Sequence, residues 1–148
     1  MAGQSLKFLT DQQIADVHEK LVVRDGGQPG YRPGASLAAV LDRVRNMIRF
    51  GGSRCTNPEL IAALTTYAIS IGEPFNDGNR RTALACGLMV LRVNGCRAEP
   101  EAVALLRLLV AACAGERSQE KFAADYIALI RQAEIRQAHG RRPVLRAS

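Results

Sequence analysis

Apolar residues recur at helical spacing in six successive segments of the chain, and no segment alternates apolar with polar residues as a half-buried strand would. Capping side chains at Thr10, Ser36 and Asn57 precede the first three segments, and glycines follow several of them. The pattern predicts helices at about residues 10–25, 36–51, 57–72, 79–94, 100–115 and 118–135. It therefore indicates an all-α bundle of six helices.

The helix expected at 79–94 is apolar around most of its circumference, so it should lie at the centre of the bundle.

The chain has 148 residues, no internal repeat and no long linker, which favours one domain. No apolar run approaches the roughly 20 residues of a membrane span. The first residues do not resemble a secretory signal. We therefore expect a cytoplasmic protein.

The formal net charge is +6, and part of this excess lies at the C-terminal end. Residues 135–148 contain no acid and four arginines, Arg136, Arg141, Arg142 and Arg146. We interpret them as a solvated basic tail, with an acidic protein or nucleic acid as the alternative partner.

The cysteines show no C-x-x-C spacing, which favours reduced thiols over a metal site at Cys55, Cys86, Cys96 and Cys113.

The stretch EPFNDGNRR, residues 73–81, leads from one predicted helix into the next. The first N–H groups of a helix lack intrahelical partners and the helix dipole is positive there, so a helix start can bind an anion. Gly78 allows close approach of a ligand to the backbone, and Asn79 can cap the helix and donate a hydrogen bond. An ordinary capped helix start is the alternative interpretation.

Three further side chains in this stretch favour a phosphate ligand. Arg80 and Arg81 carry forked donors that suit phosphate oxygens. Asp77 suits a divalent cation that bridges such oxygens. Phe75 is expected to anchor the loop in the core. The sequence thus predicts a site for phosphate and a metal ion, or else a helix start with solvated arginines.

The same residues carry a resemblance to a known family. PFNDGNRRTAL, followed by LRVNG, resembles the active-site loop and helix of the Fic/Doc family, whose usual pattern is His-Pro-Phe-x-Asp-Gly/Ala-Asn-Lys/Gly-Arg. LTDQQIADVHEKLVVRDGGQPGYRPG is similar to the N-terminal helix and glycine-rich loop of the Doc, or death-on-curing, branch. The resemblance covers about residues 7–135 of a single domain at 1–148, with 136–148 as a basic tail.

The resemblance implies a six-helix intracellular enzyme that transfers part of a nucleotide, ATP, to a protein hydroxyl. Most Fic members transfer AMP, whereas the Doc branch transfers phosphate to elongation factor Tu and is neutralised by the antitoxin Phd. The chain lacks the Ser/Thr-x-x-x-Glu-Gly/Asn inhibitory sequence of some Fic proteins. Control of a Doc-like toxin would therefore come from a separate, Phd-like antitoxin.

Carried over by position, the family pattern makes Asp77 the Mg²⁺ ligand and Arg81 a phosphate-binding arginine. It makes Gly78 and Asn79 the turn that cradles phosphate. Arg80 stands where AMP-transferring members have Gly and the Doc branch has Lys, which favours phosphate transfer. The loop at Gly26 and Gly27 resembles the flap that positions the target segment, with a plain connection as the alternative.

The departure from the family pattern is Glu73, which stands at the position of the catalytic His. An ordinary glutamate is a weaker base than an ordinary histidine by roughly two pKa units, and it adds negative charge beside phosphates. Three accounts remain open. The chain is a natural member with lost or changed chemistry, an engineered or selected inactive form of a toxin, or an enzyme in which a carboxylate acts as the base, as in protein kinases.

Two classes of function follow. The first is a Doc-like toxin that transfers phosphate and is impaired by Glu73, with AMP transfer as the variant reaction. The second is a non-catalytic protein that keeps the fold as a binding module for a nucleotide, an antitoxin or another protein. The other histidines are not expected to replace the catalytic one, since His18 lies in the first helix and His139 in the tail.

Overall fold

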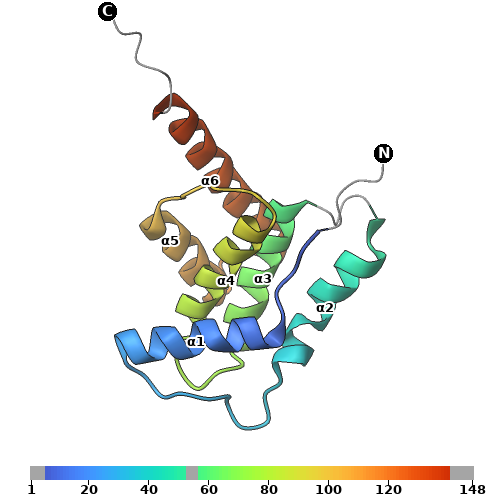
Figure 1. Cartoon of the computed structure of the whole chain (residues 1–148), viewed down its shortest axis with the longest axis vertical. Coiled ribbons are helices and arrows are strands. Elements are labelled where there is room, and N and C mark those ends of the chain that lie inside the picture. Colours follow the sequence, from blue (N-terminus) through green and yellow to red (C-terminus); the bar gives the residue numbers. More distant parts are fainter. Residues whose placement is uncertain (1–5, 53–56, 141–148) are drawn as a thin grey trace, which may run out of the picture.

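A computed structural model describes residues 6–52 and 57–140 of the chain, and these residues form six helices with no strand (Figure 1). The predicted all-α fold is confirmed, with α5 beginning two residues after the expected Pro100. The helices are α1 (Asp11–Asp25), α2 (Leu37–Phe50), α3 (Pro58–Gly72), α4 (Asn79–Val93), α5 (Ala102–Cys113) and α6 (Gln119–Gly140).

The first three helices begin at the capping residues that the sequence predicts. The Thr10 hydroxyl accepts a hydrogen bond from the Gln13 N–H at 3.1 Å, and the Gln13 side chain accepts one from the Thr10 N–H at 2.8 Å. This reciprocal pair is a capping box at the start of α1. Ser36 and Asn57 cap α2 and α3 in the same way, through side-chain oxygens.

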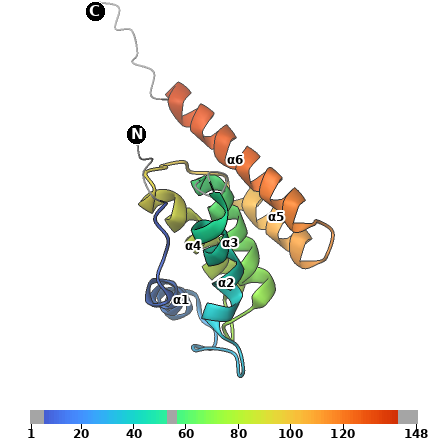
Figure 2. The same cartoon turned by 90° about the vertical axis from the view of Figure 1, so that its right-hand side faces the viewer.

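Helices α3 and α4 form the centre of the bundle, with α1 on one side and α5 and α6 on the other (Figure 2). The central position of α4 was expected from the sequence. Helix α3, which has the larger set of buried side chains and contacts α2, α4, α5 and α6, shares that position. Gly87 of α4 allows the close approach, because an added Cβ there would lie 2.1 Å from the Thr66 hydroxyl oxygen of α3.

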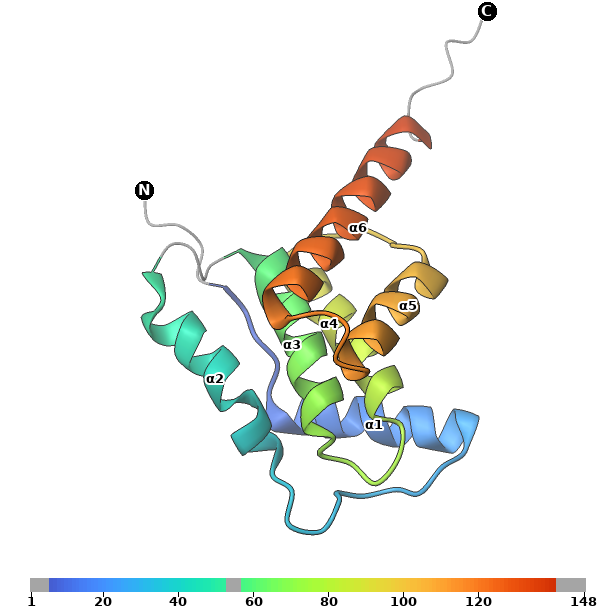
Figure 3. The same cartoon turned by 180° about the vertical axis from the view of Figure 1, so that it is seen from behind.

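Two connecting loops lie together at one end of the bundle, below α1 in Figures 1 and 3. They are the α1–α2 loop, residues 26–36, and the α3–α4 loop, residues 73–78. The Arg32 N–H donates to the Pro74 oxygen at 2.9 Å, and the Asn76 N–H donates to the Gly30 oxygen at 3.0 Å. These antiparallel contacts give the α3–α4 loop a fixed position against the flap-like loop.

Helix α6 is longer than the sequence predicts and projects beyond the other helices (Figure 2). Residues 136–140, which were assigned to the basic tail, continue this helix, and His139 lies in its last turn. The rest of the tail, 141–148, lies outside the described residues. Among the described helices, none is both long and apolar enough to cross a bilayer.

The described cysteines, Cys86, Cys96 and Cys113, are free thiols, as predicted, while Cys55 lies outside the described residues. Burial raises the pKa of the Cys86 thiol to about 12. This thiol is therefore protonated at neutral pH, and we interpret it as a packing residue of α4.

Candidate functional site

The α3–α4 loop is anchored in the core by Phe75, as predicted. This side chain is 2% exposed, and its ring stacks on His18 at a centroid distance of 3.8 Å and on Tyr31 at 5.1 Å. Asn79 closes the loop from the other side: its Oδ1 accepts from the Phe75 N–H at 3.0 Å and its Nδ2 donates to the Phe75 oxygen at 2.9 Å. The loop therefore enters α4 in a fixed shape.

His18 of α1 contacts this loop directly, which the sequence analysis did not foresee. Its side chain is 3% exposed, and Nε2 lies 2.7 Å from the backbone oxygen of Asp77. Because a carbonyl oxygen only accepts, Nε2 carries the proton in this contact. A sequence signal existed, since Ile14, His18 and Val22 follow each other at intervals of four residues and share the buried face of α1.

The start of α4 is open. Gly78 is the N-cap residue, with φ 76° and ψ 18°, and no side chain of the described residues caps the helix there. The Asn79 side chain does not cap, contrary to the prediction, because it is bonded to Phe75. The first intrahelical bond runs from the Thr82 N–H to the Gly78 oxygen, so the N–H groups at 79–81 precede the helical ladder. Such groups can donate to an anion.

Asp77 and Arg81 flank this helix start, and both contact the α1–α2 loop. The Asp77 side chain is exposed, and its Oδ2 accepts from the Gln28 N–H at 2.7 Å. The Arg81 guanidinium donates from Nη2 to the Gly26 oxygen at 3.3 Å. The structure thus brings together an acid and a cation whose side chains border the open N–H groups.

The predicted flap glycines lie at this site. Gly27 has φ 120°, and an added Cβ would lie 3.2 Å from the Asp77 Cβ and 3.7 Å from Arg81 Nη2. An L side chain at Gly27 would therefore be both strained and crowded. Gly26 provides the carbonyl that Arg81 contacts. The close approach of this loop to Asp77 depends on Gly27, whereas an added Cβ at Gly26 would meet no atom within 4 Å.

Asp25, the last residue of α1, also lies at this site, although the sequence analysis did not identify it. Its Oδ2 lies 3.2 Å from Arg81 Nη1. Arg24 donates to both carboxylate oxygens, from Nε at 2.9 Å and from Nη2 at 2.8 Å. The hydrogen bond from Arg24, assisted by Arg81, lowers the pKa of the Asp25 carboxyl to about 2. Asp25 is therefore an anion at neutral pH, placed against the cation that was predicted to bind phosphate.

Arg80 is exposed and does not join these contacts. Successive residues of an α-helix point about 100° apart, so Arg80 and Arg81 leave α4 in different directions. Within residues 6–52 and 57–140, Arg80 has no ion pair or side-chain hydrogen bond. Its side chain is available to a ligand or target that approaches the start of α4 from solvent.

Glu73 ends α3 in the left-handed conformation, with φ 45° and ψ 59°, and its side chain is exposed. It is the one non-glycine residue with positive φ among the described residues. Arg32 donates to the Glu73 oxygen at 2.8 Å and to the Gly72 oxygen at 3.1 Å, which holds the backbone in place. Glu73 thus stands at the junction of α3 and the α3–α4 loop.

The site suits Mg²⁺ only in company with a ligand. No group of three or more His, Cys, Asp or Glu side chains that would hold a metal ion occurs in the described part of the chain. Mg²⁺ is commonly bound by one or two carboxylates, with substrate phosphates and water completing its shell. The exposed Asp77 carboxylate fits that arrangement.

Comparison with known proteins identifies the family. No protein-family model matches the chain. The chain is 30% identical over 115 residues to the protein kinase Doc of Escherichia phage P1, and the similarity covers 76% of this chain and 87% of that protein. The six-helix fold, the loop that leads into α4 and this similarity show that the chain is a Doc-like member of the Fic/Doc family.

Proposed function

We propose that the chain is a Doc-like toxin whose site transfers phosphate from ATP to a hydroxyl of a target protein, and that Glu73 impairs this reaction. The observation that carries the proposal is the open start of α4, bordered by the Asp77 carboxylate and the Arg81 guanidinium. The similarity to a protein named as a kinase supports phosphate as the transferred group.

The proposed roles are those that the family pattern assigns, and the contacts at the start of α4 are compatible with them. The backbone at Gly78 and Asn79 presents N–H groups to the phosphates, and Arg81 neutralises them with forked donors. Asp77 would hold Mg²⁺, which would supply positive charge to offset that of the phosphates. The exposed Arg80 adds bulk and charge at the helix start, which favours phosphate transfer over AMP transfer. The loop at Gly26 and Gly27 positions the target segment.

We expect Glu73 to lower the rate of phosphate transfer. A general base must take the proton of the target hydroxyl as the phosphate is transferred. A carboxylate is a weaker base than an imidazole and repels the polyphosphate that lies beside it. The Glu73 side chain is exposed, so burial does not keep it from a target. Impaired transfer follows from its chemistry rather than from its place in the loop.

Membership of the family suggests partners for the chain. We propose a Phd-like antitoxin as the inhibitor, because the chain lacks the internal inhibitory sequence, and an elongation factor Tu-like protein as the target. Transfer from ATP to such a target places the protein in the cytoplasm. A non-catalytic binding module is the second candidate, and the observation that favours it is the carboxylate at position 73.

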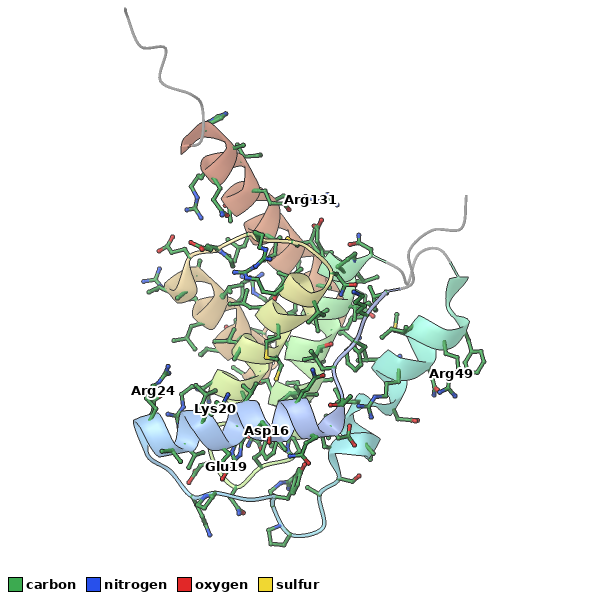
Figure 4. The ribbon with its side chains drawn as sticks, viewed as in Figure 1. Asp16, Glu19, Lys20, Arg24, Arg49 and Arg131 are labelled. Carbon is green, nitrogen blue, oxygen red and sulfur yellow. The ribbon has the colours of Figure 1, made fainter. Side chains whose placement is uncertain are left out.

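Titration calorimetry with ATP, with and without Mg²⁺, tests the site. The intact chain should bind ATP more tightly with Mg²⁺, and Arg81→Ala should weaken binding by about 1.5–3 kcal/mol, the scale of a lost charged hydrogen bond. Arg131→Ala is the matched control, because Arg131 pairs with Glu59 on α3, away from the loops (Figure 4). If the intact chain binds no ATP at millimolar concentration, the start of α4 is only a helix end.

A further inference from the structure

Arg81 does not stand free at the helix start. Its Nη1 lies 3.2 Å from the Asp25 carboxylate and its Nη2 donates to the Gly26 oxygen at 3.3 Å. Both acceptors belong to the end of α1 and the first residue of the α1–α2 loop. The guanidinium is therefore folded back toward α1, and an added Cβ at Gly78 would lie 3.5 Å from Nη2.

Asp25 is itself held in place. Arg24, the preceding residue, donates to both of its carboxylate oxygens, and the Oδ2 that faces Arg81 is shared between the two arginines. Arg24 lies at the end of α1 in Figure 4, at the point where the chain turns into the α1–α2 loop. The carboxylate thus has a defined direction, toward the start of α4.

We propose that Asp25 is an affinity-determining residue that competes with the nucleotide phosphates for Arg81. This inference rests on the proposed phosphate site. In the resting chain Asp25 occupies the guanidinium, and a bound phosphate takes its place. Asp25 thereby sets a lower affinity for ATP than the site would otherwise have.

Two physical effects act in the same direction. A phosphate needs donors of the Arg81 guanidinium, and each terminal nitrogen already has one acceptor at the end of α1, so fewer of the five N–H donors are left for a ligand. The Asp25 charge also repels a phosphate that approaches the same cation. Both effects depend on the carboxylate charge. Competition for the guanidinium ends when Arg81 is removed, whereas direct repulsion of the phosphate by Asp25 remains.

The same competition couples nucleotide binding to the α1–α2 loop. Gln28, three residues after Asp25, donates its N–H to the Asp77 carboxylate at 2.7 Å. Arg81 and Asp77, the two side chains assigned to phosphate and Mg²⁺, are thus both engaged by one short segment in the resting chain. Release of Asp25 from Arg81 loosens one of these two attachments of the flap.

The test is titration of the full chain with ATP and Mg²⁺ in four forms: intact, Asp25→Asn, Arg81→Ala and the double variant. Asp16→Asn is the matched control, since it makes the same chemical change on the exposed face of α1, nine residues earlier (Figure 4). Asp25→Asn should bind ATP about two- to five-fold more tightly, the range expected when an exposed ion pair no longer competes. Asp16→Asn should bind like the intact chain.

The double variant separates competition from general repulsion. The gain from Asp25→Asn should largely disappear in the Arg81→Ala background, because the competition acts through the guanidinium. An equal gain in both backgrounds overturns the proposal, as does unchanged or weaker binding by Asp25→Asn when the intact chain binds ATP. If neither the intact chain nor Asp25→Asn binds ATP, the proposed function fails and this inference fails with it. Asp25→Ala repeats the test with a side chain that accepts no hydrogen bond.

Discussion

The imidazole of His18 lies with Nε2 2.7 Å from the backbone oxygen of Asp77, although 59 residues separate them in the chain. The same ring stacks almost parallel on Phe75, with an interplanar angle of 7°. One buried side chain of α1 thus supports both the core anchor of the α3–α4 loop and the residue assigned to Mg²⁺. We interpret His18 as a positioning residue for Asp77.

Replacing His18 by Phe should keep the stacking and remove the hydrogen bond. The Asp77 oxygen then loses its donor, and the free energy of unfolding should fall by about 1–3 kcal/mol, as expected for an unsatisfied partly buried group. Chemical denaturation measures this change. His139→Phe in the last turn of α6 is the control, and it should leave stability nearly unchanged. Equal effects of the two substitutions would show that His18 has no special role.

Replacing Glu73 by His should restore the general base. Transfer to the target should rise by about 10²–10⁴-fold, the contribution of a positioned base. Glu73→Gln, which removes the charge but supplies no comparable base, should stay poorly active. An intact chain already as active as the His variant would show that the carboxylate is a competent base.

The mass of the modified target tests the role of Arg80. Because the arginine adds bulk at the start of α4, the Glu73→His enzyme should add one phosphate group. Mass spectrometry of the target distinguishes the two products. A mass increase that matches AMP would mean that Arg80 does not select phosphate transfer.

Glu73 should also carry conformational strain. Left-handed backbone costs a non-glycine residue roughly 1 kcal/mol, and glycine adopts it readily. Glu73→Gly should therefore raise the free energy of unfolding by about 0.5–1 kcal/mol. Glu116→Gly, at an exposed residue without positive φ, should be neutral or destabilising. Thermal unfolding compares the two, and a loss of stability in Glu73→Gly would contradict the expected strain relief.

Gly87 should not accept a side chain. An added Cβ would lie 2.1 Å from the Thr66 hydroxyl oxygen, 2.7 Å from the Tyr126 hydroxyl and 3.2 Å from the Ala62 backbone oxygen. Gly87→Ala should separate α3 from α4 and lower the free energy of unfolding by about 1–3 kcal/mol. Gly140→Ala has no atom within 4 Å of the added Cβ and serves as the control. A stable Gly87→Ala variant would contradict the packing described between α3 and α4.

The ion pairs of Asp25 should contribute a stability that is lost in acid. Its pKa is about 2 in the fold and near 3.8 in an ordinary carboxyl, so its ion pairs stabilise the fold above about pH 4. The contribution is lost as the pH falls through about 2. Urea unfolding of the intact chain and Asp25→Asn should therefore differ most at neutral pH and converge in acid. A difference that stays constant down to pH 2 would argue against a charged Asp25 in the pairs.

The helices and their first residues are determined by local signals. Thr10 and Gln13 form a capping box within one turn, and Asn57 and Pro58 begin α3 where the sequence places them. Hydrogen bonds between residues three or four apart depend only on the local chain, so they can be predicted without knowledge of the fold. The local prediction was wrong at Asn79, because two local hydrogen-bonding arrangements compete there. Its side chain bonds to the backbone of Phe75, four residues earlier, instead of capping α4.

The sequence by itself determined that a glycine-led helix start would stand beside Asp77 and Arg81, because these residues lie within five positions of one another. That no side chain caps this start was decided by the fold. Only the tertiary structure decided which distant groups meet them. His18, Asp25 and Gln28 lie 49 to 59 positions away from their partners in the α3–α4 loop and α4. Their contacts depend on how α1 packs across α4, and that packing is decided by the burial of whole helix faces rather than by any local pattern.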